Sequence, residues 1–209
     1  MKSGFKDLLF YPDTFFKNIA LEKVNLIPPV IIVAGGCAIS LLGTIIPLCF
    51  SIVYTMVFDS SINWMHFPVL GYAWYLIRCY VLWPSLGWIL LAVILYLISR
   101  LFSQSGSFPA LLQNVGYGML PWVVSSLVSL VVISLLITQP EYHTNILLNP
   151  ATVSAIIFYA FLLWCCCVWV YAIKHTCQIL IQRAIVVVVL GVLACFIPFY
   201  LAAYIPVIF

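Results

Sequence analysis

Apolar stretches of 20 or more residues recur along nearly the whole chain of 209 residues, and this feature limits the possible fold more than any other. A helix that crosses a bilayer needs about 20 consecutive apolar residues, whereas apolar runs in soluble proteins are shorter. Hydrophobic residues make up 66% of the chain and charged residues 6%, while soluble domains carry about 25% charged residues. The sequence therefore predicts an all-α, polytopic integral membrane protein.

Five apolar segments are long enough to be transmembrane helices. The first is too long for one straight crossing, so we expect it to tilt, to project beyond the membrane, or to break near Gly35-Gly36 or Pro47. Polar and turn-forming residues mark the intervening loops, among them Arg100 to Val115 and Lys174 to Arg183. The predicted spans are about 26–57, 72–99, 116–138, 151–173 and 182–207, and they form a transmembrane domain over residues 26–209.

Residues 1–25 mix charge with bulky apolar side chains and are predicted to be a cytoplasmic interfacial segment. Beyond Pro12, either Asp13 or Thr14 can cap a short amphipathic helix with Phe15 and Phe16 on its apolar face. That face can sink into the lipid headgroups while lysines on the other face meet anionic lipid. Alternatively, the helix docks as a lid on the cytoplasmic ends of the spans.

The distribution of basic residues predicts the orientation. With five spans, the two ends of the chain lie on opposite sides, and a cytoplasmic amino terminus leaves only Arg78 of the eight basic residues outside. We therefore predict a cytoplasmic amino terminus and an outer carboxyl terminus. The basic residues then placed inside are Lys2, Lys6, Lys17, Lys23, Arg100, Lys174 and Arg183.

No group of residues amounts to a reaction centre. An ionisable residue in mid-span would be the natural start of a mechanism, but the charged residues lie near the predicted span ends or in loops. Three consecutive cysteines, Cys165 to Cys167, point in different directions on a helix, which does not suit a tetrahedral metal site. We predict no enzymatic activity, no catalytic residue, no resident metal and no cofactor.

One weaker possibility is considered beside this prediction, and one class of partner is excluded. His66 and His143 share the predicted outer side with Asp59 and Glu141, which leaves open a weak outer metal or proton site against ordinary solvated loop residues. The net charge of +3 is scattered and forms no dense basic stripe, so no nucleic-acid partner is predicted.

Prolines and serines inside the predicted spans are relevant to a second possible function, transport across the membrane. A proline in a helix frees a backbone carbonyl and can kink the helix, which transporters use to build binding sites, although packing is the simpler explanation. Serines in the third span allow helices to approach closely and to hydrogen-bond, or they line a polar cavity. These serines are Ser125, Ser126, Ser129 and Ser134.

Three stretches of the chain carry a recognisable pattern. In "LLFYPDTFFKNI", a proline and a phenylalanine pair precede the first span; in "SGSFPALLQNVGYGMLPWVVSSLV", a Gly-Tyr pair and a Leu-Pro pair begin the third; and "WVYAIKHTCQILIQRAIVVVVL" ends at Arg183-Ala184. Together they resemble the membrane domain of the Yip (Ypt/Rab-interacting protein) family, with a departure at Cys177 and Gln178. The candidate interaction or structural positions that this resemblance marks are Pro12, Phe15, Phe16, Gly116, Tyr117 and Pro121.

The resemblance implies a role as well as a fold. Eukaryotic members are linked to Rab-type GTPases and carry a long cytoplasmic region before the first span. The corresponding region of this chain has about 25 residues and looks like that of short bacterial and archaeal relatives. Rab binding is therefore not carried over to this chain. Gly116 and Pro121 would shape the return of the chain into the membrane, with Tyr117 at the interface.

We therefore expect a non-enzymatic membrane scaffold or adaptor in the cytoplasmic membrane of a prokaryote, acting in membrane organisation or trafficking-like processes. Its expected partners are the lipid bilayer and either another membrane protein or a second copy of the chain. The alternative is a small transporter, channel or lipid-moving protein that uses a cavity among proline-kinked helices.

Overall fold

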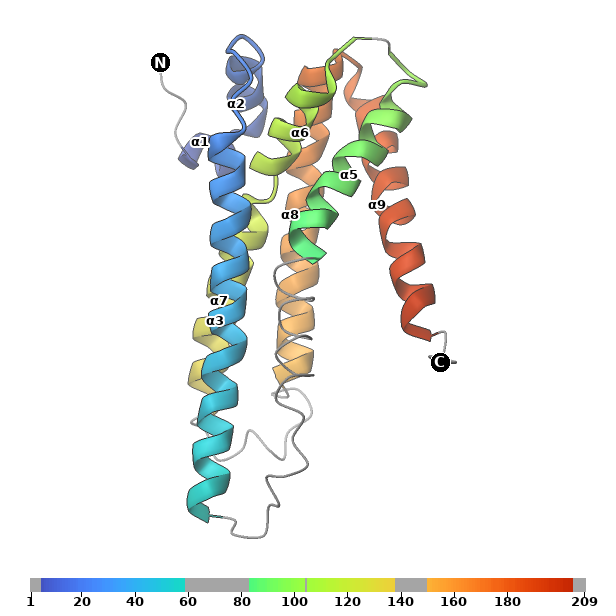
Figure 1. Ribbon diagram of the computed structural model, residues 1–209. Coiled ribbons are helices and arrows are strands. Elements are labelled where there is room, and N and C mark those ends of the chain that lie inside the picture. The colour runs from blue at the N-terminus through green and yellow to red at the C-terminus, as the bar shows by residue number, and fades with distance from the viewer. Residues whose placement is uncertain (1–4, 59–82, 104, 138–149, 205–209) are drawn as a thin grey trace.

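The computed structural model of the chain describes residues 5–58, 83–103, 105–137 and 150–204. These residues form helices and short connections, with no strand among them, which confirms the all-α prediction (Figure 1). The first part of the predicted second span, residues 72–82, lies outside the described residues, as do Asp59, His66, Glu141 and His143.

Two short helices, α1 (Phe5–Phe10) and α2 (Pro12–Ile19), precede the first long helix. Pro12 stands in the first turn of α2, where its fixed φ suits a helix and its missing N–H leaves no donor unsatisfied. The residue at the N-cap is Tyr11, and its side chain makes no capping hydrogen bond. The expected cap by Asp13 or Thr14 is therefore wrong, because the proline starts the helix earlier.

The first long helix, α3 (Ile27–Phe58), has 32 residues and runs without interruption past Gly35, Gly36 and Pro47. The predicted break near Gly35-Gly36 or Pro47 is therefore wrong, whereas a tilt or a projection beyond the membrane stays a prediction. At 1.5 Å per residue the helix is about 48 Å long. The other long helices are α5 (Trp83–Ser99), α8 (Pro150–Cys177) and α9 (Ile181–Tyr204).

The third apolar segment is divided between α6 (Phe108–Tyr117) and α7 (Leu120–Ile137). The expected loop over Arg100 to Val115 is thus wrong from Phe108 onward. Ser107 is the N-cap of α6, since its hydroxyl accepts a hydrogen bond from the backbone N–H of Ala110 at 3.4 Å. At the other end, Pro121 has no N–H for the carbonyl of Tyr117, so the helix breaks between Tyr117 and Leu120.

The connection after α8 is also shorter than predicted. The helix continues through Cys177, and the turn into α9 is made by Gln178, which has a positive φ of 52°. The expected loop of Lys174 to Arg183 is thus reduced to residues 178–180, because the polar residues at the end of α8 fit its last turn. Basic side chains are favourable there, near the negative end of the helix dipole.

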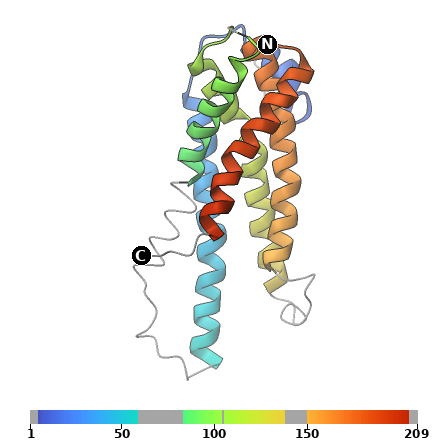
Figure 2. The same cartoon turned by 90° about the vertical axis from the view of Figure 1, so that its right-hand side faces the viewer.

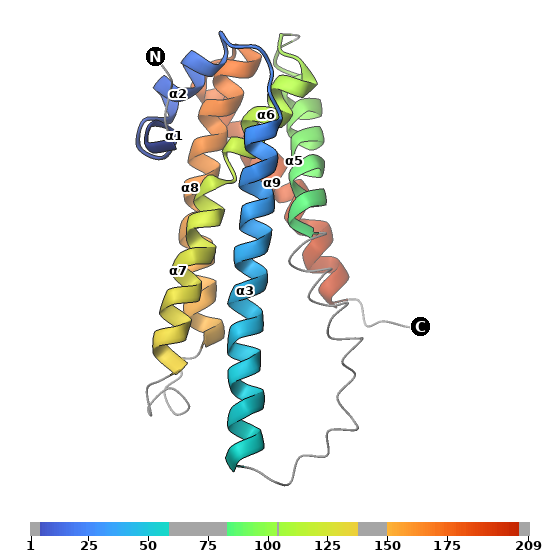
Figure 3. The ribbon, with the colours of Figure 1, turned by 60° about the vertical axis from the view of Figure 1, so that its left-hand side comes forward.

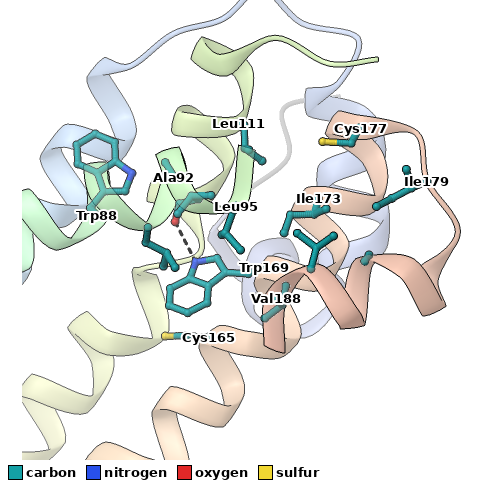
Figure 4. Packing of buried hydrophobic residues seen from close by; sticks show 14 of the residues in the cluster. Trp88, Ala92, Leu95, Leu111, Cys165, Trp169, Ile173, Cys177, Ile179 and Val188 are labelled. Atoms are coloured by element: carbon teal, nitrogen blue, oxygen red, sulfur yellow. Dashed lines mark hydrogen bonds between the residues drawn. The ribbon is translucent and has the colours of Figure 1, made fainter. Parts of the chain in front are cut away.

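The helices form a bundle in which α3 packs along α7 and α7 along α8, while α5 packs against α9. Figure 3 shows α1 and α2 on the outside of α8, and Figure 2 shows α9 crossing the bundle obliquely. The main core lies where α5, α6, α8 and α9 meet, and Figure 4 shows Trp169 in its middle, close to Leu95 and Ile173.

Within the described residues, two stretches are long and apolar enough to cross a membrane, namely Phe108–Val132 and Ala155–Cys177. Shorter apolar stretches are Ile27–Gly43, Pro84–Ser99 and Ile181–Cys195. Large apolar side chains such as Leu97, Leu163 and Val189 are exposed on the outer surfaces of the bundle, as expected where lipid is the solvent. The number of five spans stays a prediction.

Candidate functional site

Basic residues gather at one end of the bundle, which we call the basic end. It comprises α1, α2, the connection from α5 to α6, and the connection from α8 to α9 (Figure 1). Its basic residues are Lys6, Lys17, Lys23, Arg100, Lys174 and Arg183.

The apolar face of α2 is buried against the bundle. Phe15, Phe16 and Ile19 are all less than 10% exposed and pack with residues of α3, α6 and α8. The rings of Phe15 and Tyr117 meet edge to face, with centroids 5.3 Å apart and an interplanar angle of 81°. Of the two alternatives for this helix, the structure has it docked on the bundle, so these phenylalanines do not face lipid.

The polar face of α2 is tied to the end of α8. Asp13 Oδ1 lies 2.5 Å from Lys174 Nζ and 2.8 Å from His175 Nε2. The hydrogen bond from Lys174, followed by the one with His175, holds the pKa of the Asp13 carboxyl below its usual value. Because the side chain of Asp13 is 52% exposed, solvent screens this contact and each pair contributes about 0.2–1 kcal/mol.

The last turn of α6 is enclosed on several sides. A Cβ on Gly116 would lie 2.5 Å from the Cβ of Pro29 and 2.9 Å from the Trp88 ring, so only glycine fits there. The indole N–H of Trp88 donates to the carbonyl of Leu112 at 3.0 Å, and that of Trp169 donates to the carbonyl of Val115 at 3.1 Å, shown dashed in Figure 4. Val115 would otherwise lose its helical partner at the break, so Trp169 satisfies a buried acceptor.

A polar pocket opens beside α2, between α6 and the end of α8. Its volume is about 170 Å³. At its wall, Gln113 Oε1 accepts a hydrogen bond from the backbone N–H of Asn25 at 2.6 Å, and Asn114 Nδ2 donates to Thr176 Oγ1 at 2.7 Å. The lining residues are Ile19, Ala20, Glu22, Val24, Gly106, Ser107, Ala110, Gln113, Asn114, His175, Thr176 and Gln178.

The structure brings together most of the residues that the sequence motifs marked. Phe15, Phe16 and Tyr117 lie in one cluster although about a hundred positions separate the two motifs, and Gly116 lies next to them. Pro121 is fully buried at the start of α7. Pro12 is half-buried in the first turn of α2 and does not belong to the cluster.

Other residues of this region were missed at the sequence level. The contacts of Asp13 with Lys174 and His175, and of Asn114 with Thr176, join positions far apart in the chain, so no local pattern indicates them. One local signal was available for α6. Ser107 followed by Phe108-Pro109 is typical of a helix start, with an N-cap and an early proline.

The serines of α7 serve helix structure and helix contact. Ser125 and Ser134 donate to carbonyls of their own helix, Trp122 and Leu130, both at 2.7 Å. Ser126 lies 2.9 Å from Ser40 of α3, oxygen to oxygen, which confirms the predicted contribution to helix contact for this residue. In the part of the chain that the structure describes, no three His, Cys, Asp or Glu side chains are placed to hold a metal ion.

Comparison with known proteins adds two findings. A family model described as the Yip1 domain matches residues 6–203 and so includes all three motif stretches. An uncharacterized protein of Methanocaldococcus jannaschii is 30% identical over 133 residues, which are 59% of this chain and 84% of that relative. No solved structure matches the chain. The resemblance seen in the motifs is confirmed, and an archaeal relative agrees with a short prokaryotic type.

Proposed function

The chain belongs to the Yip1 domain family of membrane proteins, and from this premise we propose that it acts as a non-enzymatic scaffold or adaptor. In this role, α1 and α2 form the surface that meets a partner at the cytoplasmic side. The partner is another membrane protein or a second copy of the chain, and the role belongs to membrane organisation or trafficking-like processes.

The observation that carries the proposal is the fixed position of α2. Its apolar face is buried through Phe15 and Phe16, while its polar face is held by Asp13 on Lys174 and His175. A segment held on two faces loses little further freedom when a partner binds, which favours affinity. The docked segment also presents large apolar side chains on its surface, since Tyr11 is 61% exposed and Leu21, just after α2, is 86% exposed.

The proposal includes an orientation in the membrane. Placing the basic end in the cytoplasm follows the preference of basic residues for that side. The chain then crosses a prokaryotic cell membrane five times and has its carboxyl terminus outside. In this arrangement α1 and α2 lie at the cytoplasmic headgroups, where Phe10 and Tyr11 suit the interface between water and lipid.

The alternative of a transporter, channel or lipid-moving protein has no specific support among the described contacts. Ser125 and Ser134, which could have lined a polar path, hydrogen-bond to carbonyls of their own helix. Ser126 bonds across the contact between α3 and α7. Hydrogen bonds of this kind are typical of packed helices, so they do not favour a transport function.

Site-specific cross-linking in native membranes tests the proposal. A photoreactive residue replaces Leu21 beside α2, and as a matched control it replaces Leu163, which is 69% exposed on the apolar surface of α8. We expect one discrete protein adduct from position 21 that survives purification in mild detergent, and none of that mass from position 163. An adduct of twice the chain mass identifies a second copy.

A further variant links the adduct to the docked segment. Asp13→Ala removes the contact with Lys174 and His175 and should weaken the adduct from position 21. Labelled lipid as the sole product at both positions, with no stable protein partner in detergent, would overturn the adaptor proposal.

A further inference from the structure

The first helix of the chain, α1, lies lower on the bundle than the helix that follows it. Phe10, the last residue of α1, packs against Trp164 of α8 with ring centroids 6.4 Å apart, whereas Asp13 in the first turn of α2 is bound to Lys174 of α8. Ten residues of α8, or about 15 Å, separate these two contacts. Figure 3 accordingly shows α1 on the outside of α8, below α2.

The outer face of α1 carries one basic and one aromatic side chain. Lys6 and Phe10 are four residues apart, so they lie on the same side of the helix, and both are exposed, Phe10 by 64%. Leu8, two residues from each, is fully buried against the bundle. An exposed aromatic ring one turn from a lysine is typical of a segment at the boundary between headgroups and acyl chains.

The depth of α1 fits this boundary. In the proposed orientation, α8 crosses the membrane from Pro150, so about 20 residues, or 30 Å, of hydrocarbon end near Val170. Trp164 and the Phe10 ring against it then lie about 9 Å inside this edge, and interfacial helices enter it by about 5–10 Å. The Lys174 contact with Asp13 lies beyond the edge, among headgroups and water.

The surface of α8 around Trp164 is one that lipid covers. Leu163 is 69% exposed, and Phe158 and Tyr159, further from the basic end, are exposed as well. No charged residue occurs in α8 before Lys174. A soluble partner at α1 would have to displace acyl chains from this surface, so a lipid is the occupant that fits.

The charge of the basic end selects the headgroup. Its six basic residues stand against three carboxylates in the described part of the chain, and one of these, Asp13, is already engaged by Lys174 and His175. Such an excess of positive charge attracts anionic lipid. One basic residue close to the membrane surface strengthens the attraction about fivefold.

We propose that α1 binds an anionic phospholipid of the cytoplasmic leaflet, with the Lys6 ammonium at the headgroup and the rings of Phe10 and Trp164 against the acyl chains. This inference rests on the orientation given with the proposed function. It divides the surface formed by α1 and α2, since α1 meets lipid, which leaves α2 and the segment after it for a protein partner.

Photocross-linking of the full-length chain tests the lipid contact. A photoreactive residue replaces Phe10 in nanodiscs of equal parts phosphatidylglycerol, which is anionic, and phosphatidylcholine, which has no net charge. Mass spectrometry should find phospholipid adducts with about a fivefold excess of phosphatidylglycerol, and the excess should shrink at high salt. The same residue at Leu163, on the apolar surface of α8, is the control and should capture both lipids equally.

Variants locate the charge that selects the lipid. With the photoreactive residue at position 10, Lys6→Gln should lower the excess of phosphatidylglycerol about fivefold, whereas Lys6→Arg should preserve it. Lys23→Gln makes the same change of charge at an exposed position after α2 and should leave the excess as it is. Because Lys6 is exposed, its two variants should keep the melting temperature of the unmodified chain in discs of phosphatidylcholine alone.

Three results would overturn the proposal. They are a protein adduct in place of phospholipid at position 10, equal capture of the two lipids there, and an equal effect of Lys23→Gln and Lys6→Gln, which would mean that only the total charge counts. A protein adduct from position 21 beside any of these would leave the adaptor role standing. Phosphatidylglycerol at position 10 with lipid alone at position 21 would overturn the adaptor role and not this proposal.

Discussion

The ring of Phe15 contacts the ring of Tyr117 edge to face, although the two residues are separated by more than a hundred positions. Phe15 belongs to the amphipathic helix α2 and Tyr117 to the last turn of α6. Through this contact the first two motifs of the sequence form one packed cluster. The positions marked by the family resemblance are thus explained first by packing.

A double-mutant cycle on this pair should show coupling. We expect Phe15→Leu and Tyr117→Leu each to destabilise the protein, and the pair to deviate from additivity by about 0.5–1.5 kcal/mol, the usual value for an edge-to-face contact beyond its buried area. The free energy of unfolding in detergent micelles measures this. Strictly additive losses would show that the two rings contribute only as separate apolar groups.

Gly116→Ala should destabilise the bundle. The new methyl group would overlap the ring of Pro29, which cannot rotate away, and overpacking of this kind costs about 1–3 kcal/mol. Gly35→Ala is the control, because a Cβ there meets no atom within 4 Å and alanine is the better helix former. Thermal unfolding of the two variants should therefore shift in opposite directions or by clearly different amounts.

Trp169→Phe should leave the buried carbonyl of Val115 without its donor, at a cost of about 1–3 kcal/mol beyond the loss of packing. Trp164→Phe makes the same change of size at a partly buried position of the same helix. The comparison of their unfolding free energies isolates the hydrogen bond. Equal losses for the two variants would argue that the indole of Trp169 contributes by volume alone.

Docking of α2 should weaken in acid. Since the pKa of Asp13 is lowered in the folded chain, its contribution is complete above the ordinary value of about 3.9 and is lost as the pH falls through the lower, folded-state value. The protection of the α2 amides against hydrogen exchange, relative to their intrinsic exchange rate at each pH, should therefore fall below about pH 4.

Asp13→Asn is the control for this pH dependence. Asp13 is not the only carboxyl group at this end of the bundle, so only the part of the lost protection that the variant no longer shows belongs to Asp13. An identical pH profile in the two proteins would mean that the contact with Lys174 and His175 does not hold α2.

The sequence predicted the elements of this fold better than their contacts. The long apolar runs gave α3, α8 and α9 within a few residues, because a span must be continuous and apolar in a bilayer. The polar residues Gln113 and Asn114 misled the prediction at α6, since they indicated a loop, whereas both are buried and hydrogen-bonded. The ion pair of Asp13 with Lys174 depends on tertiary structure alone, so no local pattern could reveal it.

Phe15, Phe16, Gly116 and Tyr117 were marked as important by the motifs, and the structure brings them into one region. The pocket beside them was not foreseen. Its residues come from three separate segments and share no spacing.

The break between α6 and α7 has a mechanical consequence. A proline break in a membrane helix can act as a hinge, because the carbonyls it exposes can exchange partners as the helix bends. Here the indole of Trp169 on α8 holds the carbonyl of Val115, and the close contact of Gly116 with Pro29 ties α6 to α3. Bending at this break would strip a buried acceptor of its donor, at about 1–3 kcal/mol, so these two contacts brace α6 against α3 and α8 and oppose bending at the junction.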